Sequence, residues 1–500
     1  MWDVILAITI VALYLAAKQR RKPSRLPPGP PGLFLFGNAL EIRKAPFLWV
    51  KLDEYAQSYG GIFTFHLLGR STVVLNAPNA GIDLFEKRAA NFATRPTIHM
   101  ADLCRWEDAI LFIPYGPRLR SYRKPLQQTL NTRAIVDLEN IQIQEVKMLM
   151  KRLLTSPQDF LDHAKLYGQA VSLRIAYGHI VRDCNDEFIQ TAEEFMKALA
   201  EALLPGKWLV EVIPSMRYIP SWFPGATFKR KAEEWAEATA KHRQAPFDYV
   251  LKNMAEGTAE PSFTSRLLEL EDGKSVGDSE KEMIKIVASH LYGAGAHTTA
   301  SIFQSFFLAM TLYPHVQSAA QAELDAYLTT KRTLTVDDRE HLPYTHAIIK
   351  ESLRWHPVTN IIARQAKEDE VVGEWVIPKG TYMIGNLWAM LHNMEIYPDP
   401  YTFRPERFLG DNPAPDPAMY AFGFGRRICP GNHIALQSLW LVISNTLANF
   451  EISKFRTPDG EEITPKEEYT NGILSQPLPF KNSIKPRSST SRALVDDVEI

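Results

Sequence analysis

Hydrophobic residues recur every three to four positions along most of the chain, which is the spacing of one buried face of an α-helix. This pattern is clearest in residues 134–154, 280–312, 315–329 and 344–355. Residues 62–76 instead alternate apolar and polar side chains around a Gly-Arg turn, which is typical of a β-hairpin, and a second strand-rich segment follows at 371–388. The pattern predicts a mainly α-helical protein with a small β-sheet region.

The first residues have a different pattern. Residues 4–17 contain no charge, and a basic cluster follows at once, Lys18, Arg20, Arg21 and Lys22. As a helix this run would be about 21 Å long, shorter than the roughly 30 Å hydrocarbon core of a bilayer, but the basic side chains can extend toward the headgroups. We therefore expect residues 1–22 to form a single-pass membrane anchor with the rest of the chain in the cytoplasm. A cleaved signal peptide is the alternative, which Asp3 before the apolar run disfavours.

The division into domains depends on where linkers occur. A Pro-rich segment, residues 23–32, is expected to form a stiff hinge after the anchor. Although 500 residues could make two or three domains, no later linker, repeat or low-complexity tract divides the chain. We predict one large domain over residues 33–487, followed by a polar C-terminal tail, residues 488–500, that frays.

Charge and cysteine content exclude several classes of protein. The chain has 56 Lys and Arg against 57 Asp and Glu, so there is no excess of positive charge to bind nucleic acid. The cysteines, Cys104, Cys184 and Cys429, are too few and too far apart for a disulfide framework or a CxxC metal site, which favours a reducing compartment. Cys104 and Cys184 are interpreted as small core residues.

Cys429 differs from the other two cysteines in its surroundings. The pattern F-x-x-G-x-R-x-C-x-G is matched by Phe422, Gly425, Arg427, Cys429 and Gly431. Glycines let backbone amides approach a thiolate, and a nearby cation can meet a haem propionate. The segment resembles the haem-binding loop of the cytochrome P450 family, which implies that Cys429 ligates the haem iron and that the other four residues bind the cofactor. A thiolate ligand favours O–O cleavage and hence oxygen activation.

The same resemblance implies a buried ion triad. Glu351 and Arg354 lie three positions apart, on one face of a predicted helix. Arg407, in the sequence Pro-Glu-Arg-Phe, falls where the family has a second arginine for the same glutamate. A lone Glu-Arg pair is typical of a solvated surface bridge, whereas the resemblance implies a structural triad beneath the haem. Glu351→Ala should then lose haem, because it leaves buried charge without a partner.

A third match lies in the long apolar segment, where residues 294–299 read Ala-Gly-Ala-His-Thr-Thr. By the resemblance this segment lies over the iron, where small residues make room for dioxygen and the Thr298 hydroxyl positions water for proton delivery. The alternative is that Thr298 only bonds to its own helix backbone. His297 stands where the family has Asp or Glu. Our hypothesis is that His297 joins the proton relay, and a rotated, space-filling histidine is its rival.

Arginines elsewhere in the chain are candidates for the haem propionates. The resemblance implies this role for Arg123 and Arg364 in addition to Arg427. Leu119 replaces the tryptophan of the family motif W-x-x-x-R, which removes one expected hydrogen-bond donor. The basic run at residues 118–124 would suit an acidic flavoprotein reductase, and an ordinary solvated face is the alternative.

The substrate pocket is expected to be mostly apolar. By the family layout it would include Leu103, Trp106, His290, Ala294, Val358, Ile361, Ile362 and Leu474. Apolar residues at these positions are also compatible with plain core. The aromatic stretch at residues 218–224 falls where the family often dips a loop into the membrane, which would favour lipophilic substrates.

The resemblance covers residues 26–487 and is finest to fungal microsomal monooxygenases of secondary metabolism, through the Pro-Gly-Lys-Trp and Trp-Phe-Pro-Gly stretches. It implies a haem b enzyme of the endoplasmic reticulum membrane that inserts one oxygen atom from O2 into a terpenoid or other small lipophilic metabolite. Electrons from NADPH would arrive through the flavins of a separate reductase, with cytochrome b5 as a further partner. Two alternatives stay open: a reductase-independent haem-thiolate isomerase or dehydratase, and a non-catalytic haem-binding membrane protein.

Overall fold

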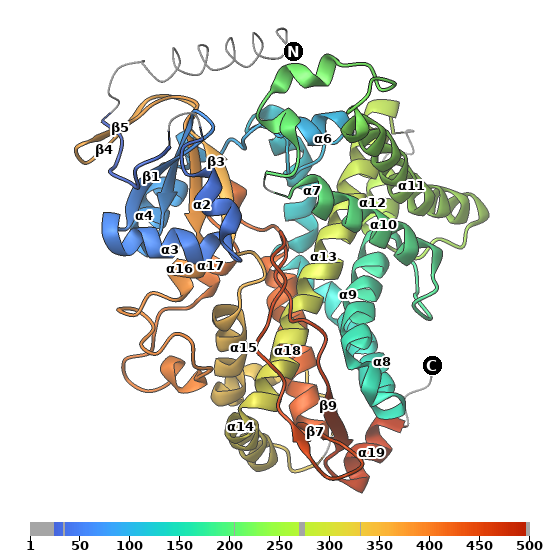
Figure 1. Cartoon of the computed structure of the whole chain (residues 1–500). Coiled ribbons are helices and arrows are strands. Elements are labelled where there is room, and N and C mark those ends of the chain that lie inside the picture. The colour runs from blue at the N-terminus through green and yellow to red at the C-terminus, as the bar shows by residue number, and fades with distance from the viewer. Residues whose placement is uncertain (1–24, 34–35, 205, 270–275, 331, 497–500) are drawn as a thin grey trace.

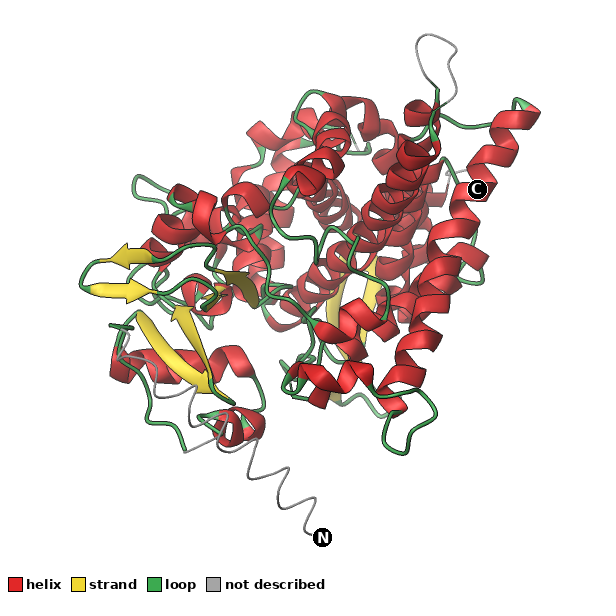
Figure 2. Cartoon of the chain, turned by 90° about the horizontal axis from the view of Figure 1, so that it is seen from above, coloured by secondary structure: helices red, strands yellow, loops and turns green. Residues whose placement is uncertain are grey.

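A computed structural model describes residues 25–33, 36–204, 206–269, 276–330 and 332–496. A helical body is joined on one side by a smaller region that contains most of the strands (Figures 1 and 2). The long helices are α7 (Pro117–Leu130), α8 (Glu139–Thr155), α9 (Phe160–Tyr177), α10 (Glu187–Ala202), α11 (Thr227–Glu256), α13 (Asp278–Leu312), α14 (Pro314–Tyr327), α15 (Pro343–Trp355) and α18 (Asn432–Asn449). The prediction of a mainly helical protein with a small sheet region is confirmed.

Shorter elements connect the long helices. The short α-helices are α2 (Ala39–Lys44), α3 (Leu48–Tyr59), α4 (Pro78–Gly81), α5 (Ala89–Phe92), α6 (His99–Leu103), α12 (Phe263–Leu268), α16 (Leu387–Leu391), α17 (Ala418–Ala421) and α19 (Ser489–Asp496). One π-helix, η1 (Ile82–Lys87), and 3-10 turns complete the set: η2 (Ala134–Leu138), η3 (Pro157–Asp159), η4 (Leu209–Glu211), η5 (Pro214–Tyr218), η6 (Val336–His341), η7 (Pro405–Phe408) and η8 (Gly425–Arg427). The segment predicted as one helix over 134–154 thus begins with the turn η2 and continues as α8.

Helix α13 runs through the middle of the body and packs along α9 (Figure 1). Close approach of the two helices depends on small residues. A Cβ atom added at Gly168 of α9 would lie 2.3 Å from the carbonyl oxygen of Ala296, and one at Gly295 would lie 2.5 Å from Oγ of Ser172. Because real Cβ atoms do not approach so closely, larger residues at either glycine would push α13 away from α9.

The main sheet has the strand order β1-β2-β6-β3. Its strands are β1 (Ile62–Leu67), β2 (Arg70–Leu75), β3 (Ile361–Gln365) and β6 (Tyr382–Asn386). The predicted hairpin over 62–76 is confirmed as β1 and β2, and its turn has positive φ at Leu68 (48°) and Gly69 (78°), as a tight hairpin turn requires. Strand β2 pairs with β6 in parallel, and the two strands lie more than 300 residues apart in the chain.

Two small sheets lie apart from the main one. The predicted strand-rich segment 371–388 supplies β4 (Glu370–Val372) and β5 (Trp375–Ile377) before β6, and its last two residues already belong to α16. A third sheet, β8-β7-β9, was not predicted. Its strands are β7 (Phe450–Arg456), β8 (Glu462–Ile463) and β9 (Asn482–Pro486).

The expected membrane anchor, residues 1–22, lies outside the described residues. Within the described ranges, no helix is both long and apolar enough to cross a membrane. The described part of the expected hinge, residues 25–32, is held against the sheets: the Thr64 amide donates to the Pro28 carbonyl at 2.8 Å, and the Val376 amide donates to Arg25 at 2.8 Å. This part of the segment is therefore docked on the body and is not a free linker.

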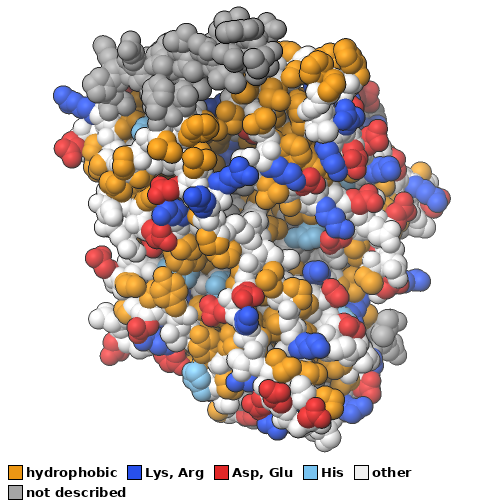
Figure 3. Space-filling view, in the orientation of Figure 1, with side chains coloured by type: hydrophobic (Ala, Val, Ile, Leu, Met, Phe, Trp, Pro, Cys, Tyr) orange, Lys and Arg blue, Asp and Glu red, His pale blue; other side chains and the backbone are white. Residues whose placement is uncertain are grey.

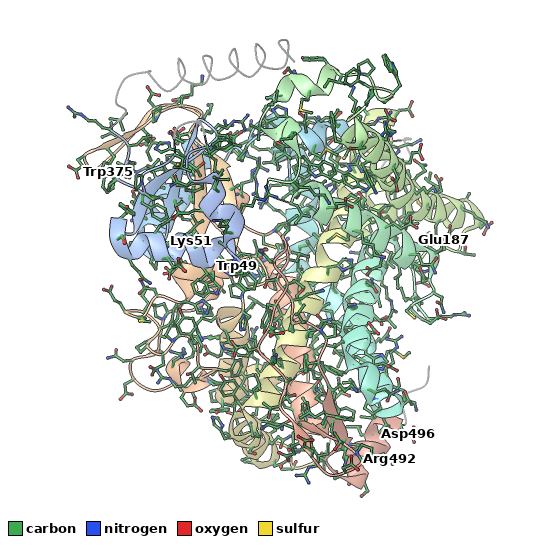
Figure 4. All side chains as sticks on the ribbon, in the orientation of Figure 1. Trp49, Lys51, Glu187, Trp375, Arg492 and Asp496 are labelled. Atoms are coloured by element: carbon green, nitrogen blue, oxygen red, sulfur yellow. The ribbon has the colours of Figure 1, made fainter. Side chains whose placement is uncertain are left out.

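The prediction of a frayed tail after residue 487 is wrong for residues 489–496, which form α19. This helix packs on α8, where the Lys151 ammonium lies 2.8 Å from the Asp496 carboxylate. Figure 4 labels Arg492 and Asp496 on α19 beside the end of α8. Val495 is buried, and this apolar contact holds α19 in place although its serine-rich sequence is typical of a loop.

Candidate active site

The loop before α18 carries Cys429. Gly425 in η8 has φ of 51°, and a Cβ atom there would lie 2.5 Å from the Phe85 carbonyl oxygen, so only glycine fits. The Cys429 amide donates to the Phe422 carbonyl at 2.9 Å, which closes the loop. A Cβ atom at Gly431 would lie 3.9 Å from the Cys429 sulfur, so the backbone passes close to this thiol.

The surroundings of Cys429 shift the pKa of its thiol in opposite directions. Burial raises the pKa of the Cys429 thiol, while a backbone N–H of Gly431 and the positive charge of Arg123 act to lower it. The sulfur also lies just before the N-terminus of α18, the positive end of that helix. Burial is the largest of these effects, so the pKa of the thiol is raised on balance, and the Gly431 N–H and Arg123 offset part of the rise.

Four arginines gather beside this loop. Arg123 of α7 donates to the Ile428 carbonyl at 2.7 Å, and Arg427 donates to the carbonyls of Ala93 (2.8 Å), Ile110 (3.0 Å) and Ile113. Arg364 on β3 is buried, and within the described part of the chain its guanidinium donates only to the Ala363 carbonyl, at 3.0 Å.

Sequence reasoning missed the fourth arginine, Arg95. Its Nη1 shares the Ala363 carbonyl at 3.1 Å, and its buried Nε atom has no hydrogen-bond partner. Arg95 reaches Arg364 because a β-bridge pairs Thr94 with Gln365. No motif in the sequence joins these segments, so only the antiparallel bridge between two distant parts of the chain reveals it.

The arginine cluster, meaning Arg95, Arg123, Arg364 and Arg427, lacks acidic partners. Burial and mutual repulsion hold the pKa of Arg364 well below its usual range and lower that of Arg427 to about 9, and burial lowers that of Arg95 to about 10. Among the described residues, none of the four is paired with a carboxylate. Buried cations need anions, so the cluster fits a ligand with closely spaced carboxylates, as the two haem propionates are.

Helix α13 presents Thr298 and Ala294 on one face. The Thr298 hydroxyl donates to the Ala294 carbonyl at 2.8 Å, which is the backbone bond that the structural alternative expected. Ala294 is exposed although α13 is the central helix. A small residue therefore leaves space one turn before the threonine.

His297 faces the other way, toward α9 and α10. Its Nε2 lies 3.7 Å from Oε1 of Glu193 and makes no hydrogen bond. Glu193 in turn accepts from Gln169 at 3.0 Å. Burial lowers the pKa of His297, Glu193 raises it, and Lys165 lowers it. His297 thus belongs to a polar group between three helices.

The structure brings Glu351, Arg354 and Arg407 together. Glu351 accepts from Arg354 Nε at 2.7 Å and Nη2 at 2.8 Å, from Arg407 Nε at 3.2 Å, and from the Arg404 amide at 2.8 Å. The side chains of Glu351 and Arg354 are fully buried. The triad ties α15 to η7 and has no exposed group, so it is a structural element.

The expected pocket residues separate into two groups. Trp106 and Ile362 are buried, and Trp106 donates to Thr239 at 2.7 Å; their place in the pocket stays a prediction. Partly accessible or exposed positions are Leu103, His290, Ala294, Val358, Ile361 and Leu474. The Ser475 amide donates to the Val358 carbonyl at 2.7 Å, which joins two of these segments.

Three further expectations concern single residues. Leu119 is completely buried in the main core, so it offers packing in place of the family's hydrogen bond. Cys104 is buried and its pKa is raised to about 12, as expected for a core cysteine. Cys184 is exposed, so its interpretation as a core residue is wrong.

Comparison with known proteins agrees with this geometry. The family model for Cytochrome P450 matches residues 27–484. The chain is 37% identical to a cytochrome P450 monooxygenase of Armillaria gallica, over 99% of this chain and 97% of that protein. It is 36% identical to cytochrome P450 monooxygenase claR of Ampulloclitocybe clavipes, over 98% and 91%, and 34% identical to ppsD of Aspergillus oryzae, over 99% and 96%. The chain therefore belongs to the cytochrome P450 family and is a monooxygenase.

Proposed function

We propose that this monooxygenase inserts one oxygen atom from O2 into a small lipophilic substrate, a terpenoid or another secondary metabolite. The observation that carries the proposal is the arginine cluster without carboxylates beside Cys429. Haem b, held there by the Cys429 thiolate, would supply the activation of dioxygen. The four guanidinium groups would hold its propionates, and the glycines of the loop would let the backbone lie close to the sulfur.

Proton delivery is assigned to Thr298 and His297. The Thr298 hydroxyl can donate to water or dioxygen once it leaves the Ala294 carbonyl, which lies 2.8 Å away. His297 would receive protons from the partly exposed Glu193 carboxylate, and its ring would then turn from α9 and α10 toward Thr298 to pass them inward. This arrangement would replace the acidic residue of the family by an imidazole on α13 and a carboxylate on α10.

Electrons from NADPH would come from a separate flavoprotein reductase, with cytochrome b5 as a second donor. Four exposed basic residues support a docking surface near the Cys429 loop: Arg118, Arg120, Lys124 and Arg426. The guanidinium groups of Arg120 and Arg426 both lie over the Tyr115 ring, 5.8 and 5.0 Å from its centroid. A positive surface of this kind attracts an acidic partner and speeds its association.

A lipid surface is the proposed source of the substrate. Between α10 and α11, Leu209 is 63%, Tyr218 72% and Trp222 77% exposed. Figure 3 shows hydrophobic side chains gathered over this part of the molecule. Exposed aromatic and aliphatic groups insert at the bilayer boundary, which supports an enzyme of the endoplasmic reticulum membrane, anchored by residues 1–22.

The test is co-expression with a fungal reductase in cells supplied with a panel of terpenoids, followed by mass analysis. We expect a product that gains one oxygen atom, labelled when 18O2 replaces O2, and no product from Cys429→Ala. Products formed without NADPH or oxygen would support the alternative isomerase or dehydratase. No oxygen-dependent product across the panel would favour a binding protein without catalysis.

A further inference from the structure

His290 lies on α13, eight residues before Thr298. Because α-helical residues four apart share a face, His290, Ala294 and Thr298 form one line along α13. With a rise of 1.5 Å per residue, His290 lies about 12 Å along the helix axis from Thr298.

The flanks of this line are covered by other helices. A Cβ atom at Gly293 would meet His242 of α11 at 3.6 Å and Phe195 of α10 at 3.9 Å. On the other flank, a Cβ atom at Gly295 would meet Ser172 of α9. Ala294, between the two glycines, is exposed. At Ala294 this side of α13 is thus left open, and His290, one turn earlier on the same line, lies near Arg243 of α11 and is only partly covered.

Hydrogen bonding determines which nitrogen of His290 carries the proton. Nδ1 lies 2.7 Å from the Ile286 carbonyl oxygen, which can only accept, so Nδ1 is the donor. In the neutral ring Nε2 is then an acceptor. No described residue donates a hydrogen bond to Nε2.

The charge of His290 follows from its surroundings. Burial lowers its pKa to about 4, with a further decrease from Arg243, while its own bond to Ile286 and the Asp108 carboxylate act in the opposite direction. Arg243 and Asp108 are themselves paired at 3.0 Å. The ring is therefore neutral near pH 7. It is nevertheless partly accessible.

We propose that Nε2 of His290 accepts a hydrogen bond from a hydroxyl group of the substrate, about 12 Å from the carbon that is oxidised beside Thr298. The inference rests on the proposed function and deepens it: the substrate is an elongated lipophilic alcohol. A neutral hydroxyl fits better than an ammonium group, which would have to leave water near Arg243. An ether or ketone at the same position would leave two acceptors facing each other without a proton.

The test compares alcohols with their methyl ethers on the haem-loaded enzyme. The probe pairs are dodecan-1-ol, farnesol and geranylgeraniol, each with its methyl ether, and the dissociation constant is read from the change in the haem absorption spectrum. We expect at least one alcohol to bind about 10-fold more tightly than its ether. In His290→Leu the ratio should fall below about 2, while His290→Gln, which keeps an acceptor, should retain part of the preference.

His346→Leu is the matched control. His346 is another partly buried histidine, on α15, with its pKa also lowered to about 4. This variant should keep the full preference for the alcohol, which separates the effect of His290 from that of removing any buried imidazole. Carbon monoxide difference spectra of all variants measure intact haem-thiolate content.

Two results would overturn the inference, and only the second would also contradict the proposed substrate class. Equal binding of alcohol and ether, or a preference that survives in His290→Leu, contradicts the role of His290 and leaves the lipophilic substrate class in place. Absence of binding by every probe, with haem content intact, contradicts that class and the inference together. Oxidation in the wild type should also lie at the end of the probe remote from the hydroxyl, and should spread along the chain in His290→Leu.

Discussion

Replacing Glu351 by alanine removes the acceptor that joins two buried arginines. Three hydrogen bonds from guanidinium groups and one from the Arg404 amide are lost, and Arg354 and Arg407 keep only backbone carbonyl partners. Breaking a buried ion pair on one side costs about 3–5 kcal/mol. Since domains are stable by about 5–15 kcal/mol, Glu351→Ala should lose a large part of its stability and, with it, haem.

The assay is urea unfolding followed by far-ultraviolet circular dichroism, with the carbon monoxide difference spectrum for haem. Glu351→Asp keeps the charge but shortens the side chain, so it should lose less stability than Glu351→Ala. The matched control is Glu406→Ala, which removes an exposed carboxylate in the same region and should cost at most about 1 kcal/mol. A Glu351→Ala protein with wild-type stability and full haem content would refute the assigned role of the triad.

Three further outcomes follow from other sites. Arg95→Leu should release haem at least about 10-fold faster to excess apomyoglobin, because one of four propionate partners is lost; an unchanged rate would remove Arg95 from the haem site. His297→Ala and Glu193→Gln should each lower product formed per NADPH by about 10-fold or more, and the double variant should lose little more than either; unchanged coupling in either single variant would eliminate the relay. Burial lowers the pKa of His242 to about 3 from 6.5, so the folded state resists a proton that the unfolded chain binds. Above pH 6.5 His242 is neutral in both states and does not lower the free energy of unfolding, whereas between pH 6.5 and 3 this free energy falls by up to about 5 kcal/mol. The free energy of unfolding of His242→Phe should therefore depend less on pH in that range.

Local patterns in the sequence predicted the parts of the site that are continuous in the chain. The Cys429 loop needs glycine at 425 because the backbone there has positive φ, and this requirement is visible as a motif. The apolar segment 280–312 agrees with α13 to within two residues at its start. Glu351 and Arg354 share a helical turn, so their pairing also follows from spacing.

Contacts between distant segments could not be predicted in this way. Arg95 joins the arginine cluster through a bridge between residues 94 and 365, and nothing in its own sequence indicates an anion site. The indole N–H of Trp106 donates to Thr239 of α11, 133 residues away, a contact that no local pattern indicates. The face that His297 presents depends on Glu193, a residue of another helix. Tertiary packing determined each of these outcomes.

The arginine cluster also has a consequence for how the protein matures in the cell. Four cations from α7, β3, the segment around Arg95 and the Cys429 loop repel one another until an anion lies between them. Newly made chains are therefore expected to finish folding around haem, and those without it to stay open to proteolysis. Cellular haem supply, more than transcript level, would then set how much of this enzyme accumulates.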